Sequence, residues 1–142
     1  MLRRAAVVVL ALAATAVFAV PAHAAANRNL VGEGSTAQFL CPSGLTVPAT
    51  ISFSAQKSKG IVSGSYNIFG TGVSKFGQIR SGTITQNSYS LEGITTTEVC
   101  GGASLSVPVN ATLSGECGTG VIIHYEDALG ERGDFLGNVA CT

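Results

Sequence analysis

The clearest hydrophobic pattern in the chain lies between Leu105 and Cys117, where apolar or small residues occupy every odd position. Polar residues or proline stand between most of them. This period of two predicts a half-buried β-strand, because successive side chains of a strand point to opposite faces. Pro108 has no backbone N–H, so this part of the strand is expected at a sheet edge or at a bulge.

The same alternation recurs in shorter stretches rich in β-branched residues along most of the chain. In one of them, Ile51, Phe53 and Ala55 share one face. Turn-forming residues separate the stretches, and no helical period appears after residue 24. We therefore expect strands at residues 35–41, 50–56, 61–69, 78–86, 89–99, 105–117, 121–126 and 131–141, and a glycine-rich connection at 70–77.

This succession predicts an all-β fold, a single antiparallel β-sandwich or up-and-down barrel of about eight strands. Glycines lie inside several of the expected strands, at positions 64, 82, 93, 115 and 137. Glycine weakens a strand unless the sheet bends or another backbone approaches closely. The glycines therefore indicate a strongly curved sheet, and the choice between sandwich and barrel stays open.

The first residues have the pattern of a secretory signal peptide. Arg3 and Arg4 precede an apolar run at 5–20, and Ala22-His23-Ala24 is typical of a cleavage site. We therefore expect a signal peptide at 1–24, a flexible tail at 25–34 and an all-β domain at 35–142. The expected location is outside the cytoplasm, secreted or periplasmic, with no membrane insertion of the mature chain.

Charge is scarce in the expected mature chain. Removal of Arg3 and Arg4 leaves six basic residues against eight acidic ones, a net charge of −2. A protein that binds nucleic acid through phosphate contacts needs a basic patch, which this composition does not offer. The same shortage argues against binding to an anionic membrane surface.

The four cysteines, Cys41, Cys100, Cys117 and Cys141, all follow the expected cleavage site. An even number in an exported chain predicts two disulfides. Zinc binding is disfavoured, because the chain has no C-x-x-C pair and only one histidine beyond the leader, so no metal site or cofactor is expected. If eight strands alternate in direction, the cysteine positions at strand ends favour Cys41–Cys100 and Cys117–Cys141.

The most polar segment is the expected hairpin around residues 127–130, a sequence typical of a type I turn followed by a glycine bulge. Its register sets Glu126 opposite Arg132 and His124 opposite Asp134. These four residues form a candidate polar cluster on one face of the hairpin. The simplest interpretation is two cross-strand pairs of opposite charge, each contributing about 0.2–1 kcal/mol.

Other interpretations of this cluster are open. His124 and Asp134 have the types of a general base and its orienting acid, although no nucleophile motif accompanies them. Arg132-Gly133-Asp134 matches the integrin-binding tripeptide, which we interpret as a chance match. A weak calcium site is a further alternative. Its carboxylates would be those of Glu126, Asp127, Glu131 and Asp134.

These features favour a non-enzymatic exported domain, a binding or cell-envelope interaction module for an unidentified protein, polymer or small molecule. An alternative is a small-ligand carrier with an interior pocket, in which Tyr66, Tyr89 and Tyr125 supply polar groups. A third, less favoured alternative is a secreted hydrolase that uses His124 and Asp134.

Overall fold

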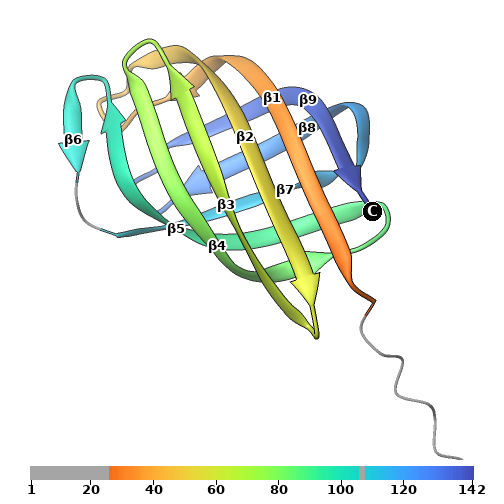
Figure 1. Cartoon of the computed structure of the whole chain (residues 1–142). Coiled ribbons are helices and arrows are strands. Elements are labelled where there is room, and N and C mark those ends of the chain that lie inside the picture. Colours follow the sequence, from red (N-terminus) through yellow and green to blue (C-terminus); the bar gives the residue numbers. More distant parts are fainter. Residues whose placement is uncertain (1–25, 106–107) are drawn as a thin grey trace, which may run out of the picture.

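A computed structural model describes residues 26–105 and 108–142, and these residues form nine β-strands and no helix (Figure 1). The predicted signal peptide lies outside the described residues. The strands are β1 (Arg28–Leu40), β2 (Thr46–Ser58), β3 (Ile61–Gly70), β4 (Val73–Ile84), β5 (Ser88–Cys100), β6 (Ala103–Leu105), β7 (Val109–Glu116), β8 (Gly118–Asp127) and β9 (Arg132–Cys141).

The sheet closes on itself. Its strand order is β4-β3-β2-β1-β9-β8-β7-β5-β6, and a further pairing between β4 and β5 joins the two ends. All pairings are antiparallel, and the short β6 pairs only with the end of β5, outside the ring of strands (Figure 1). The fold is therefore an eight-stranded up-and-down barrel, which confirms the all-β antiparallel prediction and decides between its two alternatives.

Glycine allows the close backbone approach that this curvature requires. A Cβ at Gly137 would overlap the carbonyl oxygen of Glu33 on β1, and one at Gly64 would overlap the carbonyl oxygen of Ser54 on β2. Gly77 serves another purpose, because the ring of Tyr66 lies against it inside the barrel. The expected link between mid-strand glycines and a curved sheet is confirmed at these positions.

The first strand begins earlier than expected. Arg28 to Gly34 pair with β2, and Leu30 to Gly34 pair also with β9, so most of the expected flexible tail at 25–34 belongs to the barrel wall. Leu30 is fully buried and anchors this segment. Small and polar residues around Leu30 weakened the hydrophobic pattern, which is why the prediction for this segment was wrong.

Two other boundaries also differ from the expected ones. β4 already begins at Val73, so the glycine-rich connection shrinks to Thr71 and Gly72, and Gly72 has a φ of 77°. Of the predicted long strand at 105–117, Leu105 belongs to β6 and Val109 to Glu116 form β7, while residues 106–107 lie outside the described residues. Pro108 belongs to neither strand and cannot donate to a ladder.

Two disulfides link strands at opposite ends of the barrel. Cys41 bonds to Cys100 and Cys117 to Cys141, with Cα–Cα distances of 5.6 and 5.9 Å. The pairing predicted from alternating strand direction is confirmed. Two disulfides are compatible with an oxidising compartment, extracellular or periplasmic.

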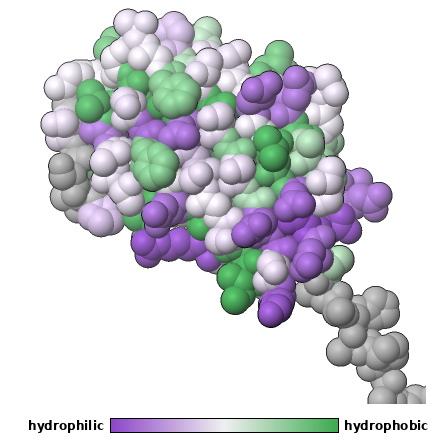
Figure 2. Space-filling model, in the orientation of Figure 1, coloured by the Kyte–Doolittle hydropathy of each residue, from purple (hydrophilic) through white to green (hydrophobic). Residues whose placement is uncertain are grey.

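Side chains from all eight barrel strands fill the interior. Phe39, Tyr66, Phe135 and Leu113 are among the largest fully buried ones, and ring pairs such as Phe39 with Phe135 pack 5.9 Å apart. Charged residues are buried among them, and these form the inner of the two candidate sites. On the face that Figure 2 shows, weakly polar and hydrophobic side chains are interspersed, and strongly hydrophilic ones gather toward one end.

Candidate functional site

The hairpin of β8 and β9 has the predicted register. His124 lies opposite Asp134, Glu126 opposite Arg132 and Ile123 opposite Phe135. In the turn, the amide N–H of Gly130 donates to the carbonyl oxygen of Asp127, and Gly130 takes a φ of 81°. Alternation along this hairpin then places one set of polar side chains outside the barrel and a second set inside it.

The outer set contains the predicted polar cluster. His124 Nδ1 lies 2.6 Å from Asp134 Oδ1, and both side chains are largely exposed. Within the part of the chain that the structure describes, Arg132 forms no ion pair with Glu126 or any other acid. Of the two expected cross-strand pairs, only His124 with Asp134 is therefore formed.

A serine extends this pair to a row of three. Ser114 on β7 lies opposite His124, which in turn lies opposite Asp134. Serine, histidine and aspartate in this order have the residue types of a hydrolase triad. Among the described residues, however, the Ser114 hydroxyl forms no hydrogen bond with His124.

Three adjoining hollows, which we call the outer belt, cross the outside of the barrel from β7 to β3. The first, of about 290 Å³, contains His124 and Asp134. The second, of about 600 Å³, shares Asp134 with the first and lies between β9 and β1. The third, of about 500 Å³, shares Thr36 with the second and ends at Phe69 on β3.

Hydroxyl and amide groups dominate the lining of the outer belt. Its polar side chains are Ser35, Thr36, Gln38, Thr46, Thr50, Thr71, Thr112, Ser114, His124, Glu126, Arg132 and Asp134. In its middle, β1 and β9 stop pairing between Ser35 and Leu40, where β1 has a bulge. The backbone N–H of Gln38 instead donates to Thr36 Oγ1 at 3.2 Å. The lining of the belt therefore includes polar side chains and a stretch of β1 backbone that does not pair with β9.

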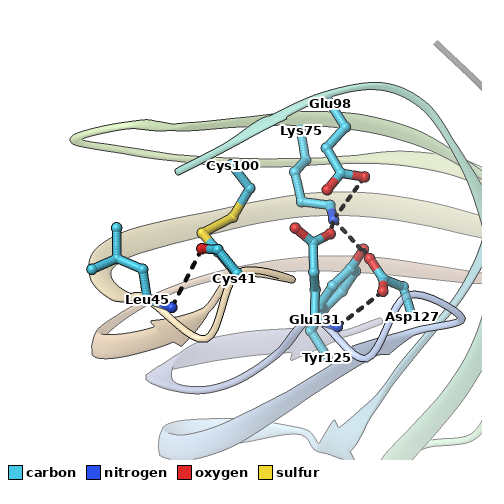
Figure 3. The surroundings of a disulfide bond; sticks show 9 residues. Cys41, Leu45, Lys75, Glu98, Cys100, Tyr125, Asp127 and Glu131 are labelled. Atoms are coloured by element: carbon cyan, nitrogen blue, oxygen red, sulfur yellow. Dashed lines mark hydrogen bonds and ion pairs between the residues drawn. A yellow bond between two sulfur atoms is a disulfide. The ribbon is translucent and has the colours of Figure 1, made fainter. Parts of the chain in front are cut away.

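The inner set is a buried charged cluster around Lys75 of β4, shown in Figure 3. Lys75 Nζ lies 2.7 Å from Asp127 Oδ2 and 3.3 Å from Glu98 Oε2, and it contacts Glu131 Oε2 directly. All four side chains are almost completely buried. One ammonium group and three carboxylates therefore share the interior near the Cys41–Cys100 disulfide.

The hydrogen bonds of the three carboxylates differ. Asp127 accepts from the Tyr125 hydroxyl at 3.1 Å and from the amides of Leu129 and Glu131 at 2.9 and 3.1 Å. In contrast, within the described residues, neither oxygen of Glu98 accepts a hydrogen bond, and Oε1 of Glu131 accepts none either. Asp127 is thus fixed by the hairpin turn, whereas Glu98 and Glu131 retain free acceptor capacity.

A tyrosine network continues the cluster into the barrel. The hydroxyls of Tyr66 and Tyr125 lie 2.6 and 3.3 Å from Thr95 Oγ1. Burial raises the pKa of Tyr66 and of Tyr125, and the negative charge of Asp127 adds to the effect on both. Burial also raises the pKa of Tyr89, whose hydroxyl has no partner among the described residues. These tyrosines, predicted as handles for a ligand, are packed core residues.

Sequence reasoning missed Lys75 and Glu98. Lys75 fell in the expected glycine-rich connection, although Val73, Lys75, Gly77 and Ile79 share one parity and all point inward. Alternation traced backwards from Ile79 would have placed Lys75 inside. Glu98 would then also be expected inside the barrel, because it pairs with Lys75 across β4 and β5.

The structure corrects the calcium interpretation of the hairpin. Asp127 and Glu131 are buried inside the barrel, whereas Glu126 and Asp134 are exposed on its outside, so the four carboxylates cannot bind one ion. Inside, oxygens of Glu98, Asp127 and Glu131 lie within 4.8 Å of one another. Lys75 Nζ contacts all three and takes the position that a cation would need.

The integrin-like tripeptide Arg132-Gly133-Asp134 forms the first three residues of β9. It therefore lies in a strand, beyond the hairpin turn.

Comparison with protein families, curated proteins and solved structures gave no match. In the part of the chain that the structure describes, no helix is long and apolar enough to cross a bilayer.

Proposed function

We propose that the protein is an exported binding module that holds an extended neutral polysaccharide along the outer belt. The observation that carries this proposal is that the three hollows adjoin one another: Arg132 and Asp134 line both the first and the second, and Thr36 lines both the second and the third. A linear polymer fits a belt better than a compact ligand does, because it can occupy all three hollows together. This proposal specifies the polymer class within the general expectation of a binding module.

The chemistry of the outer belt suits sugar hydroxyls. Serine and threonine hydroxyls and the Gln38 amide can each donate and accept, as neutral sugars require. Phe69, with 48% of its surface exposed, offers a ring face at one end of the belt. The charged side chains of the belt, Glu126, Arg132 and Asp134, lie in its first two hollows and carry both signs, so a polymer of one charge would gain little there.

The interior supports a small-ligand carrier less well. Side chains of all eight strands meet inside the barrel, where the hydroxyls of Tyr66 and Tyr125 both contact Thr95 and the ring of Tyr89 packs against Phe53. A carrier would instead need a large apolar cavity.

The experiment is affinity electrophoresis of the oxidised protein in gels that contain soluble cellulose derivatives, xylan, dextran or soluble starch. We expect retardation by at least one neutral polymer. Phe69→Ala and Gln38→Ala should each weaken it by roughly five- to tenfold, about 1–1.4 kcal/mol of binding free energy.

Phe76→Ala is the matched control, because Phe76 is similarly exposed, at 40%, but does not line the belt. Equal weakening by Phe69→Ala and Phe76→Ala would contradict the belt as the binding surface. Absence of retardation by every polymer, or capture of a protein partner alone, would contradict the polysaccharide proposal.

A hydrolase is the second candidate function, favoured by the row of Ser114, His124 and Asp134. The 2.6 Å contact between His124 and Asp134 resembles the orienting bond of a triad. The geometry supports this candidate less, since within the described residues the serine and histidine are not hydrogen-bonded, and the side chains of His124 and Asp134 are largely exposed.

A further inference from the structure

The charge of the buried cluster is not balanced. With all groups ionised, one ammonium and the carboxylates of Glu98, Asp127 and Glu131 carry a net charge of −2 in the barrel interior. Buried charges are strongly unfavourable unless each one is paired and hydrogen-bonded. Both oxygens of Glu98 and Oε1 of Glu131 accept no hydrogen bond within the described residues, and both side chains are more than nine-tenths buried. The ion pairs therefore leave part of the cluster unsatisfied.

The surroundings of Lys75 favour reaction of its amine. Its side chain is completely buried, and the rings of Phe39 and Tyr125 lie 5.9 and 5.4 Å from Nζ. Nζ must give up a proton before it can attack a carboxyl group, and the Glu98 carboxylate 3.3 Å away is placed to accept it. Nζ also contacts the carboxylate of Glu131, which directly precedes β9, and such proximity strongly accelerates reactions that are slow in solution.

The three carboxylates differ in the part they can play. Asp127 already accepts hydrogen bonds from the turn and from Tyr125, so it holds Nζ in place. Glu131 contacts Nζ through Oε2 while Oε1 is free, as an acyl group under attack requires. Glu98 lies 3.3 Å from Nζ without a hydrogen bond and can carry protons between the reacting groups.

We infer that Lys75 and Glu131 condense to an amide that links β4 covalently to the start of β9. The Nζ–Cδ bond forms and one Cδ–Oε bond of Glu131 breaks. Nζ loses two protons, which leave with the departing oxygen as one water molecule, and Glu98 transfers them. The ammonium and carboxylate charges cancel, so the step is neutral overall and needs no oxidant, reductant or further reactant.

The cross-link explains the composition of the cluster. Condensation removes two buried charges and turns the amide N–H toward Asp127, while a protonated Glu98 can donate to the new carbonyl oxygen. It also adds a third covalent connection, because neither disulfide involves β4. This inference concerns the interior and is independent of polymer binding on the outer belt.

The test is the intact mass of the purified, reduced full-length or processed protein, with the N-terminus read from the same sample. We expect a mass one water molecule below that of the reduced sequence. Trypsin should fail to cut after Lys75, and the fragment 60–80 should stay joined to 81–132 after reduction. Fragmentation of this joined peptide should place the link at Glu131. The mass of the unmodified sequence, or a link at Asp127 or Glu98, would overturn the inference.

Variants separate the roles. Lys75→Met should show the full sequence mass, whereas the matched Lys57→Met, outside the cluster, should still lack one water. Glu98→Gln keeps the shape of the side chain but removes the proton carrier, so folded Glu98→Gln protein should be mostly uncondensed. Complete condensation in Glu98→Gln would contradict the role of Glu98. Because the wild-type mass is decisive alone, a Lys75→Met variant that fails to fold leaves the test intact.

Discussion

The two polar clusters of the β8–β9 hairpin come from the same short segment but face opposite environments. His124 and Asp134 point outside the barrel, whereas Asp127 and Glu131 point inside to Lys75. Exposed ion pairs contribute only about 0–1 kcal/mol, because water and salt screen them. A buried charge that loses its partner costs about 3–5 kcal/mol. The comparison shows that residue type alone does not reveal which cluster matters for stability.

The largest expected effect is on the inner cluster. Lys75→Met should lower the free energy of unfolding by about 3–5 kcal/mol, because the buried acidic side chains lose their contacts with Nζ, which holds them as an ammonium or as the inferred amide. Urea denaturation of Lys75→Met and of the control Lys57→Met measures the difference. A loss below about 1 kcal/mol would mean that the cluster is not a buried charged unit.

A smaller effect is expected at alkaline pH, also from the interior. The folded-state pKa values of Tyr66, Tyr89 and Tyr125 are raised above the ordinary value of 10.0 by burial. The folded state therefore binds these protons more tightly than the unfolded state. The contribution of these three protonated tyrosines to the free energy of unfolding is complete below pH 10 and is lost as pH rises above it.

The melting temperature should thus fall between about pH 10 and 12, together with the appearance of tyrosinate absorbance. Tyr125→Phe should weaken this dependence. Ionisation of all three tyrosines at about pH 10 in the folded protein would show that their surroundings are open to water.

The smallest effect is expected outside. Asp134→Asn should change the free energy of unfolding by less than about 1 kcal/mol, because both partners of the His124 pair are exposed. The same variant distinguishes the second candidate function, since loss of a measured esterase activity in Asp134→Asn and in Ser114→Ala would support a hydrolase. If Asp134→Asn changed the free energy of unfolding by more than about 2 kcal/mol, the outer pair would not be the weakly stabilising one of the two clusters.

The amino-acid sequence determined the local features of this protein. Alternation identified the strands apart from the first residues of β1 and β4, and the turn at 127–130 determined the hairpin register of His124 with Asp134. Strand direction then sufficed to pair Cys41 with Cys100 and Cys117 with Cys141. These features depend on neighbouring residues or on the alternating direction of successive strands, so they can be predicted from the order of residues along the chain.

Only the tertiary structure decided that the sheet closes and what lies inside it. Closure depends on pairing of β1 with β9 and of β4 with β5, and patterning within a strand does not specify its distant partner. Lys75 meets Asp127 and Glu131 across sequence separations of 52 and 56 residues. A lone charge in a sequence indicates a solvated position, and it can be buried only when folding brings opposite charges around it.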